Sequence, residues 1–135
     1  MMMTEKQKKQ RQKNVLYAFK MYCSDTGKSL EILDVIGEGG CSIIYEVRNK
    51  RTGETVVLKA IDTALAEIDC SVSQMDKYAR EEIRALKILK GHKNIIQLID
   101  AYYCPVDVST GEMVYLMFLP KLELVTTYFK KKCQQ

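Results

Sequence analysis

The clearest chemistry in this sequence lies in a glycine-rich segment and in a lysine that follows it. The segment reads Ile36-Gly37-Glu38-Gly39-Gly40-Cys41-Ser42, and Lys59 ends the run Val56-Val57-Leu58-Lys59. Glycines allow backbone N–H groups to approach an anion closely, and a lysine nearby adds a positive charge. Together they predict a site that grips the phosphate groups of a nucleoside triphosphate.

A glutamate in a predicted helix is the candidate partner for Lys59. Apolar residues recur at three- and four-residue spacing from about Val72 to Lys90, which predicts an amphipathic helix. Glu82 lies at the edge of the apolar face and can turn inward to a cation, whereas Glu81 is expected to face solvent. A glycine-rich turn alone is commonly a plain hairpin, and a strand lysine is usually on the surface. The prediction therefore depends on all three features together.

Five short segments rich in β-branched, aliphatic and aromatic residues predict strands, at residues 30–36, 43–47, 55–61, 95–101 and 113–119. Residues 49–54 have the composition of a hairpin loop, and residues 102–111 are predicted to form a second loop. Ser71 or Ser73 is the candidate cap of the helix, and Gly91 is expected to end it. The predicted fold class is α+β: a five-stranded antiparallel sheet with one main helix between the third and fourth strands.

Length and composition fit one folded unit. A chain of 135 residues can bury one core, and 47% hydrophobic and 28% charged residues are typical of a globular protein. The five cysteines are widely spaced, and His92 is the single histidine. This pattern argues against a zinc site or a disulfide framework and predicts buried thiols in a reducing compartment. No segment is apolar enough to span a bilayer, and we expect no secretory leader.

Positive charge is concentrated near the two ends. Residues 1–13 hold five basic residues against one acidic residue, a net charge of +4 that equals the formal net charge of the whole chain. We expect this segment to be a solvated, disordered tail, and residues 14–28 to be an extension packed on the domain as a helix or strand. Lys130-Lys131-Lys132 is a second basic cluster. Contact with anionic lipid or nucleic acid is the alternative, but the first tail lacks an aromatic residue to stack on bases.

The order of these parts resembles the small, N-terminal lobe of a protein kinase over residues 29–122. Within the kinases, Gly37-Glu38-Gly39-Gly40-Cys41-Ser42 and Gly91-His92-Lys93-Asn94-Ile95 are similar to the Numb-associated serine/threonine kinases, which include adaptor-associated and cyclin-G-associated kinases. The segment from Leu98 to Cys104 and the pair Leu119-Pro120 look most like the lipidated, Golgi-associated branch of that family. Residues 123–135 would then be the hinge and the start of a large lobe.

The resemblance implies a role for each matching residue. Gly37 and Gly39 would form the lid over the phosphates, Lys59 would bind the α- and β-phosphates, and Glu82 would hold Lys59 in place. The full set implied to bind ATP is Ile36, Gly37, Glu38, Gly39, Gly40, Ile44, Val57, Lys59, Glu82 and Leu119. The implied cofactors are ATP and Mg²⁺, and the implied partners are a protein substrate and membrane-trafficking proteins. The implied location is the cytoplasm, at the periphery of Golgi or endosomal membranes.

The sequence departs from the kinase pattern in two small ways. Ser42 replaces a third glycine, and Val57 stands where alanine is usual. The register of the hinge is also open. If Met117 preceded the hinge as the gatekeeper, Pro120 would occupy a position whose backbone N–H bonds adenine, and proline has no N–H. Phe118 or Leu119 is therefore the candidate gatekeeper, and Leu119 is preferred.

The largest departure is the absence of the catalytic half of the pattern. The sequence contains no His-Arg-Asp loop, no Asp-Phe-Gly segment and no Ala-Pro-Glu segment. Phosphoryl transfer depends on positioning and charge neutralisation by those parts, so we expect this chain alone to bind ATP weakly and to lack kinase activity. The leading interpretation is a fragment or truncated form of a serine/threonine kinase. The alternative is a non-catalytic interaction module that regulates another kinase.

Overall fold

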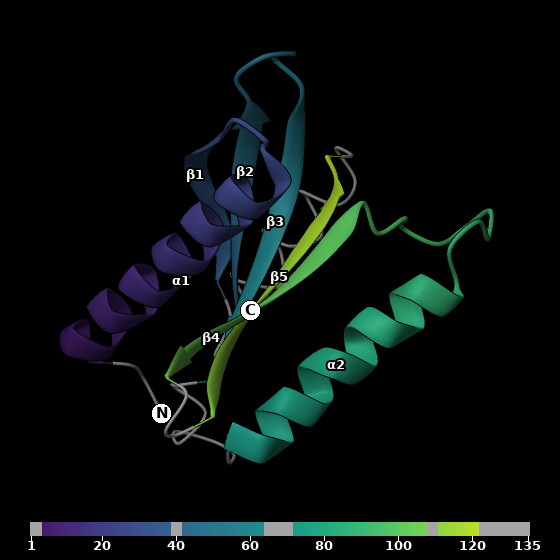
Figure 1. Ribbon diagram of the computed structural model, residues 1–135. Coiled ribbons are helices and arrows are strands. Elements are labelled where there is room, and N and C mark those ends of the chain that lie inside the picture. Colours follow the sequence, from purple (N-terminus) through teal and green to yellow (C-terminus); the bar gives the residue numbers. More distant parts are fainter. Residues whose placement is uncertain (1–3, 39–41, 64–71, 108–110, 122–135) are drawn as a thin grey trace.

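A computed structural model describes residues 4–38, 42–63, 72–107 and 111–121, which form two helices and a five-stranded sheet (Figure 1). In chain order the elements are α1 (Glu5–Thr26), β1 (Leu30–Glu38), β2 (Ser42–Asn49), β3 (Thr55–Asp62), α2 (Val72–Ile88), β4 (Asp100–Asp107) and β5 (Glu112–Pro120). The spatial order is β1-β2-β3-β5-β4, and every neighbouring pair is antiparallel. The predicted fold class is confirmed.

The sheet is covered on both faces, with α1 on one side and α2 on the other (Figure 1). Side chains alternate along a strand, so the central strand β3 contributes to two cores. Leu58 and Ala60 pack in the cluster under α1, whereas Val57 and Ile61 pack in the cluster under α2. Lys59 lies between Leu58 and Ala60 and therefore projects on the α2 face.

Helix α1 differs from the disordered tail predicted for residues 1–13, because residues 5–13 are its first part. Thr4 and Gln7 form a capping box, in which each side chain bonds the backbone N–H of the other residue. Buried residues follow at helical spacing, and they are Arg11, Val15, Ala18, Phe19 and Tyr22. The helix is thus held by a local cap and by one face packed on the sheet, and the lysines occupy its other faces.

Helix α2 agrees with the prediction over most of its length. It ends at Ile88, two residues before the predicted end, and Gly91 follows with φ of 93°. That left-handed conformation strains any residue with a Cβ, which explains the glycine. Ser71 and the side chain of Ser73 lie outside the described residues, so the predicted cap stays a prediction.

The predicted position of the fourth strand is wrong. The sequence pattern predicts a strand at residues 95–101 with a loop after it, but β4 runs from Asp100 to Asp107. Ile95, Ile96 and Ile99 are instead exposed, and the Gln97 side chain bonds Gly91 N, His92 O and Ile95 O to hold a compact turn. Pro105 is tolerated because β4 lies at the edge of the sheet, where a missing N–H costs little.

Candidate nucleotide-binding site

The predicted ion pair between Lys59 and Glu82 is present. Lys59 Nζ donates a hydrogen bond to Glu82 Oε1 at 2.6 Å, joining β3 to α2. The two side chains are 16% and 27% exposed, respectively. The pair is thus shielded from most of the solvent but open on one side, which suits a cation that must meet a second anion.

The packing of α2 aims Glu82 at the sheet. Met75, Ala79 and Ile83 are buried along one stripe of the helix, and Glu82 is adjacent to that stripe. Glu81 is exposed, and Glu82 is the glutamate that meets Lys59. The second carboxylate oxygen of Glu82, Oε2, is buried without a hydrogen-bond partner among the described residues. Glu82 Oε2 can therefore accept a hydrogen bond from a donor group that enters the site.

The apolar residues predicted to surround adenine lie on the same face as Lys59. Ile44, Val57 and Leu119 are buried in the cluster under α2, and Ile36 packs against that cluster. The pairing register shifts between Val35 and Gly37, which places Ile36 at an irregular point of β1. Such a shift changes the face on which a side chain lies. The structure thus brings these four residues to one side of the sheet.

The end of β1 carries the described part of the glycine-rich segment. Gly37 is buried and pairs with Ile44, and Glu38 pairs with Ile43. Gly39 and Gly40 lie outside the described residues, so their predicted role stays a prediction. Because β2 carries Ile44 and pairs with Lys59 on β3, the glycine-rich segment begins two strands away from the lysine.

The two candidate gatekeepers lie on opposite faces of β5. Phe118 belongs to the cluster under α1, where its ring stacks on Tyr22 with centroids 4.4 Å apart. Leu119 belongs to the cluster under α2 and pairs with Val57. Leu119 therefore lies on the face that carries Lys59 and Phe118 does not, and the gatekeeper assignment stays a prediction. Just beyond, Lys121 Nζ lies 2.6 Å from Glu46 Oε2 on β2.

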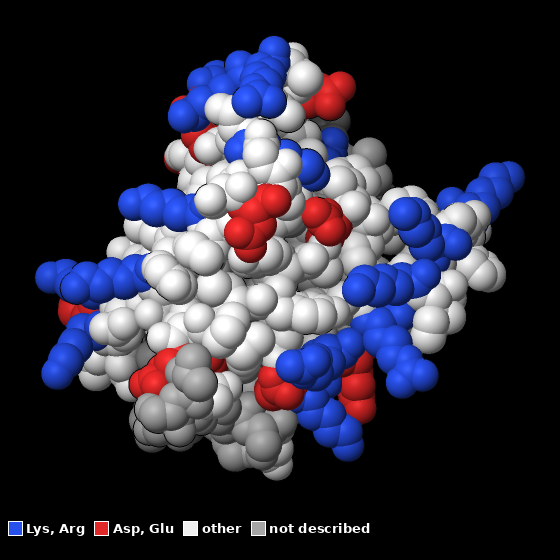
Figure 2. Space-filling model, viewed as in Figure 1, with Lys and Arg blue, Asp and Glu red and all other residues white. Residues whose placement is uncertain are grey.

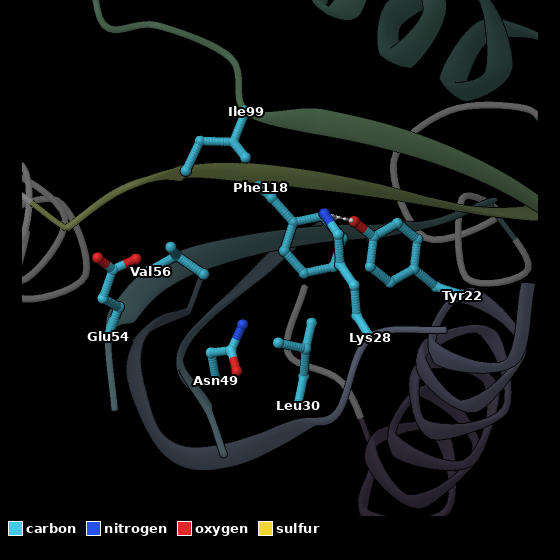
Figure 3. A pocket seen from close by; sticks show the side chains of 8 residues that line it. All are labelled: Tyr22, Lys28, Leu30, Asn49, Glu54, Val56, Ile99 and Phe118. Atoms are coloured by element: carbon cyan, nitrogen blue, oxygen red, sulfur yellow. Dashed lines mark hydrogen bonds between the residues drawn. The ribbon is translucent and has the colours of Figure 1, made fainter. Parts of the chain in front are cut away.

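A separate pocket of about 210 Å³ lies on the α1 face (Figure 3). Leu30, Val56 and Phe118 contribute its apolar lining, and Lys28 donates a hydrogen bond to the Tyr22 hydroxyl at 3.0 Å beside it. Sequence patterns did not indicate this pocket. Its lining comes from segments far apart in the chain, and it is not continuous with the face that carries Lys59.

Charge is scattered over the face of the molecule that Figure 2 shows. Figure 2 shows Lys and Arg side chains mainly around the edge of the viewed face, with acidic side chains among them and a mostly uncharged central area. The described part of the chain contains no cluster of three or more His, Cys, Asp or Glu residues suited to a metal ion. Its helices include none long and apolar enough to cross a membrane. Cys23 and Cys104 are free thiols, whereas Cys41, Cys70 and Cys133 lie outside the described residues.

Residues 30–131 match the protein kinase domain family. A lysine–glutamate pair between the third strand and the following helix, on a five-stranded sheet, agrees with that match. The chain belongs to the protein kinase domain family and carries the N-terminal portion of the domain.

Three curated relatives match this chain over 79 to 95 residues. The chain is 37% identical over 95 residues to a probable cyclin-dependent kinase 10 of Dictyostelium discoideum, covering 67% of this chain and 22% of that protein. It is 29% identical over 93 residues to myosin-IIIb of Mus musculus, covering 69% and 6%, respectively. It is 29% identical over 79 residues to the probable serine/threonine-protein kinase fhkA of Dictyostelium discoideum, covering 58% and 13%. The chain thus spans less than a quarter of the length of each of these relatives.

Among solved structures, the autoinhibited serine kinase domain of titin matches with a TM-score of 0.47 and 20% identity, covering 72% of this chain and 25% of that one. The three curated relatives do not support a placement in the Numb-associated group. That narrower placement rests on the sequence motifs alone.

Proposed function

We propose that this chain is the ATP-binding portion of a serine/threonine protein kinase. The observation that carries the proposal is the 2.6 Å contact between Lys59 and Glu82 on the face where Ile44, Val57 and Leu119 gather. In this arrangement Lys59 would meet the α- and β-phosphates while Glu82 keeps its ammonium group in place. Ile36, Ile44, Val57 and Leu119 would surround the adenine ring, and the segment from Gly37 to Gly40 would cover the phosphates.

Phosphoryl transfer requires groups that this sequence does not contain. The residues present do not fit a Mg²⁺ site, since the described residues offer no carboxylate cluster and the sequence has no Asp-Phe-Gly segment. No catalytic step is therefore assigned to the 135 residues. In a complete kinase, Mg²⁺ would neutralise phosphate charge and a catalytic aspartate would orient the hydroxyl of a protein substrate. The chain by itself is proposed to bind nucleotide weakly, because a large lobe would supply the floor of the site.

A titration with ATP, followed by NMR on the isotope-labelled 135-residue chain, tests this proposal. Millimolar ATP is expected to shift the backbone resonances of Gly37, Ile44 and Lys59. Lys59→Met should abolish most of the shift and Glu82→Gln should reduce it. Glu81→Gln is the matched control, since Glu81 is the exposed neighbour, and it should leave the titration unchanged. An unshifted spectrum of the wild-type chain, or an equal response in Lys59→Met, would overturn the proposal.

A second candidate is a non-catalytic module that docks on another kinase. The observation in its favour is a set of exposed apolar side chains on α2 and the segment that follows, which are Tyr78, Ile88, Ile95, Ile96 and Ile99. Exposed apolar patches mark interaction sites. Co-purification of a kinase with the wild-type chain, lost in an Ile88→Lys and Ile96→Lys double variant, would favour the module. A nucleotide response that needs Lys59 would favour the enzyme.

The Numb-associated motifs further suggest action at Golgi or endosomal membranes on trafficking proteins. This narrower proposal rests on sequence resemblance and not on the comparisons. Imaging of a fluorescently tagged chain in cells tests it: peripheral Golgi or endosomal signal is expected, and diffuse signal without either would contradict it.

A further inference from the structure

Helix α1 is joined to the end of β1 by a buried arginine. Arg11 Nη2 lies 2.6 Å from Glu38 Oε1, and Glu38 lies directly between Gly37 and the next glycine of the sequence. The Arg11 side chain is 3% exposed, whereas the Glu38 side chain is 49% exposed. The more buried partner belongs to the helix, and the more exposed partner belongs to the glycine-rich segment.

Because Arg11 is buried and Glu38 is partly exposed, Arg11 restricts the position of Glu38. A guanidinium group cannot lose its charge, so removing it from water is costly unless a carboxylate stays beside it. Arg11 is held by a helix whose apolar face is packed in the core, and it therefore favours one position of Glu38 over others. Tyr45 on β2 lies near this pair, where burial raises the pKa of its hydroxyl and the nearby Arg11 charge partly opposes this shift.

A second contact lies one helical turn away. Asn14 Nδ2 donates a hydrogen bond to Asp62 Oδ2 at 2.8 Å, at the end of β3. Asp62 follows Ile61, which pairs with Ser42, the last residue of the glycine-rich segment and the first residue of β2. The N-terminal half of α1 thus contacts the sheet near both sides of that segment.

The other end of α1 is fixed independently. The Tyr22 hydroxyl donates to Asp100 Oδ2 at 2.7 Å, and the Tyr102 hydroxyl donates to Asp25. Both contacts join α1 to β4 at the opposite edge of the sheet from β1. The helix is therefore attached near its C-terminal end to β4 and in its N-terminal half to the ends of β1 and β3.

We propose that α1 is a built-in brace for the phosphate-binding segment, and that Arg11 is a positioning residue that holds the end of β1 through Glu38. The consequence of this brace for nucleotide binding rests on the function proposed above, but the effect of Arg11 on the position of β1 does not. Detaching Arg11 is expected to free the Gly37–Glu38 end of β1 while the rest of the sheet stays intact.

Amide hydrogen exchange on the full chain without nucleotide tests the brace. Arg11→Gln should speed exchange at Gly37 and Glu38 by roughly tenfold, the effect expected for losing one charge-assisted hydrogen bond. Exchange at Leu116 in β5 should stay as in the wild type, which shows that the chain remains folded. If Arg11→Gln perturbs folding, Arg11→Lys is used in its place. It keeps the positive charge, and it should speed exchange at Gly37 and Glu38 by less than about tenfold.

The matched control is Arg48→Gln, the same substitution in the same β1–β2 hairpin. Arg48 pairs with Glu31 at the opposite end of that hairpin, and both side chains of this pair are partly exposed. It should change exchange at Gly37 by less than about twofold. Glu38→Gln should reproduce the effect of Arg11→Gln, and the double variant should add little to either single variant.

Two outcomes would overturn the brace: unchanged exchange at Gly37 and Glu38 in Arg11→Gln, or an equal increase at Leu116. The nucleotide measurement is separate. If ATP produces no Lys59-dependent shift but Arg11→Gln still loosens Gly37, the proposed function fails and the brace stands. If ATP binds through Lys59 but Arg11→Gln leaves Gly37 unchanged, the brace fails and the function stands.

Discussion

Lys59 and Glu82 form a polar link between the central strand and α2, with Nζ and Oε1 2.6 Å apart. Around this link α2 contacts the sheet through a narrow apolar stripe that includes Ala79 and Ile83, both fully buried. The helix position and the lysine position are thus coupled: each is defined partly by the other.

Removing the lysine alone should destabilise the fold. Lys59→Met leaves the Glu82 carboxylate partly buried without its cation, and we expect a loss of about 1–3 kcal/mol in the free energy of unfolding. Replacing both residues, as in Lys59→Met with Glu82→Leu, should cost less than Lys59→Met alone. Urea denaturation followed by circular dichroism measures the four corners of this cycle. Strictly additive effects would show that the pair contributes no coupling energy.

The apolar stripe of α2 should be far more sensitive than its exposed face. Ile83→Ala removes a fully buried side chain and is expected to cost about 2–5 kcal/mol, because a cavity remains. Ile88→Ala is the matched control, since Ile88 is 66% exposed and its truncation should change stability by less than about 0.5 kcal/mol. Urea midpoints compare the two, and similar losses would contradict the described orientation of α2.

Strong alkali should weaken the attachment of α1. The hydrogen bond to Asp25 raises the pKa of Tyr102 from 10.0 to about 12, and burial raises the pKa of Tyr22, with its hydrogen bond to Asp100 adding to the shift. The folded state favours the neutral form of the Tyr102 hydroxyl. Its contribution to the stability of the fold is therefore fully present below pH 10, the ordinary pKa of tyrosine, and is lost as pH rises through the folded pKa.

Thermal unfolding of wild-type chain and Tyr102→Phe between pH 9 and 12, read by circular dichroism, checks this. The wild type should lose stability above about pH 10, and the variant should lose less over the same interval. Tyr17→Phe is a control, because Tyr17 is exposed on α1. A steeper alkaline loss in Tyr102→Phe than in the wild type would contradict the assignment.

The two described thiols should differ in reactivity from an unfolded cysteine. Burial raises the pKa of Cys104, which is 4% exposed, and burial also raises the pKa of the partly buried Cys23. Since the thiolate is the reactive form, iodoacetamide at neutral pH should label both slowly in the folded chain and rapidly in urea. Peptide mass mapping assigns each site. Rapid labelling of Cys104 in the folded chain would show that β4 opens easily.

Much of the fold could be predicted because the information is local. Runs rich in β-branched, aliphatic and aromatic residues mark β2, β3 and β5, and three- and four-residue spacing marks α2. The failure at β4 has a physical reason. Ile95, Ile96 and Ile99 have strand-like composition, but Gln97 closes a turn around them, and the sheet instead recruits Tyr102 and Tyr103 opposite Leu116 and Tyr115. Strand propensity cannot reveal which of two apolar runs pairs with a neighbouring strand of the sheet.

The start of α1 shows a second limit. Residues 5–13 are lysine- and glutamine-rich, which is typical of solvated tails, and a helix needs tertiary contacts to be stable at this composition. Val15, Ala18 and Phe19 supply those contacts in the next turns, and the helix extends back to the Thr4 cap. Nothing local to Arg11 indicates that it would be buried against a carboxylate from β1.

The amino-acid order alone determined the parts: the glycine-rich segment, the strand lysine, the helix glutamate and the sheet that carries them, because periodicity and spacing act between near neighbours. The meeting of Lys59 with Glu82 was predicted, but its distance, the opposite faces on which Phe118 and Leu119 lie and the burial of Arg11 were decided only by the tertiary structure. Each of these depends on which face of the sheet a distant element covers, and a face is defined only when the strands have paired.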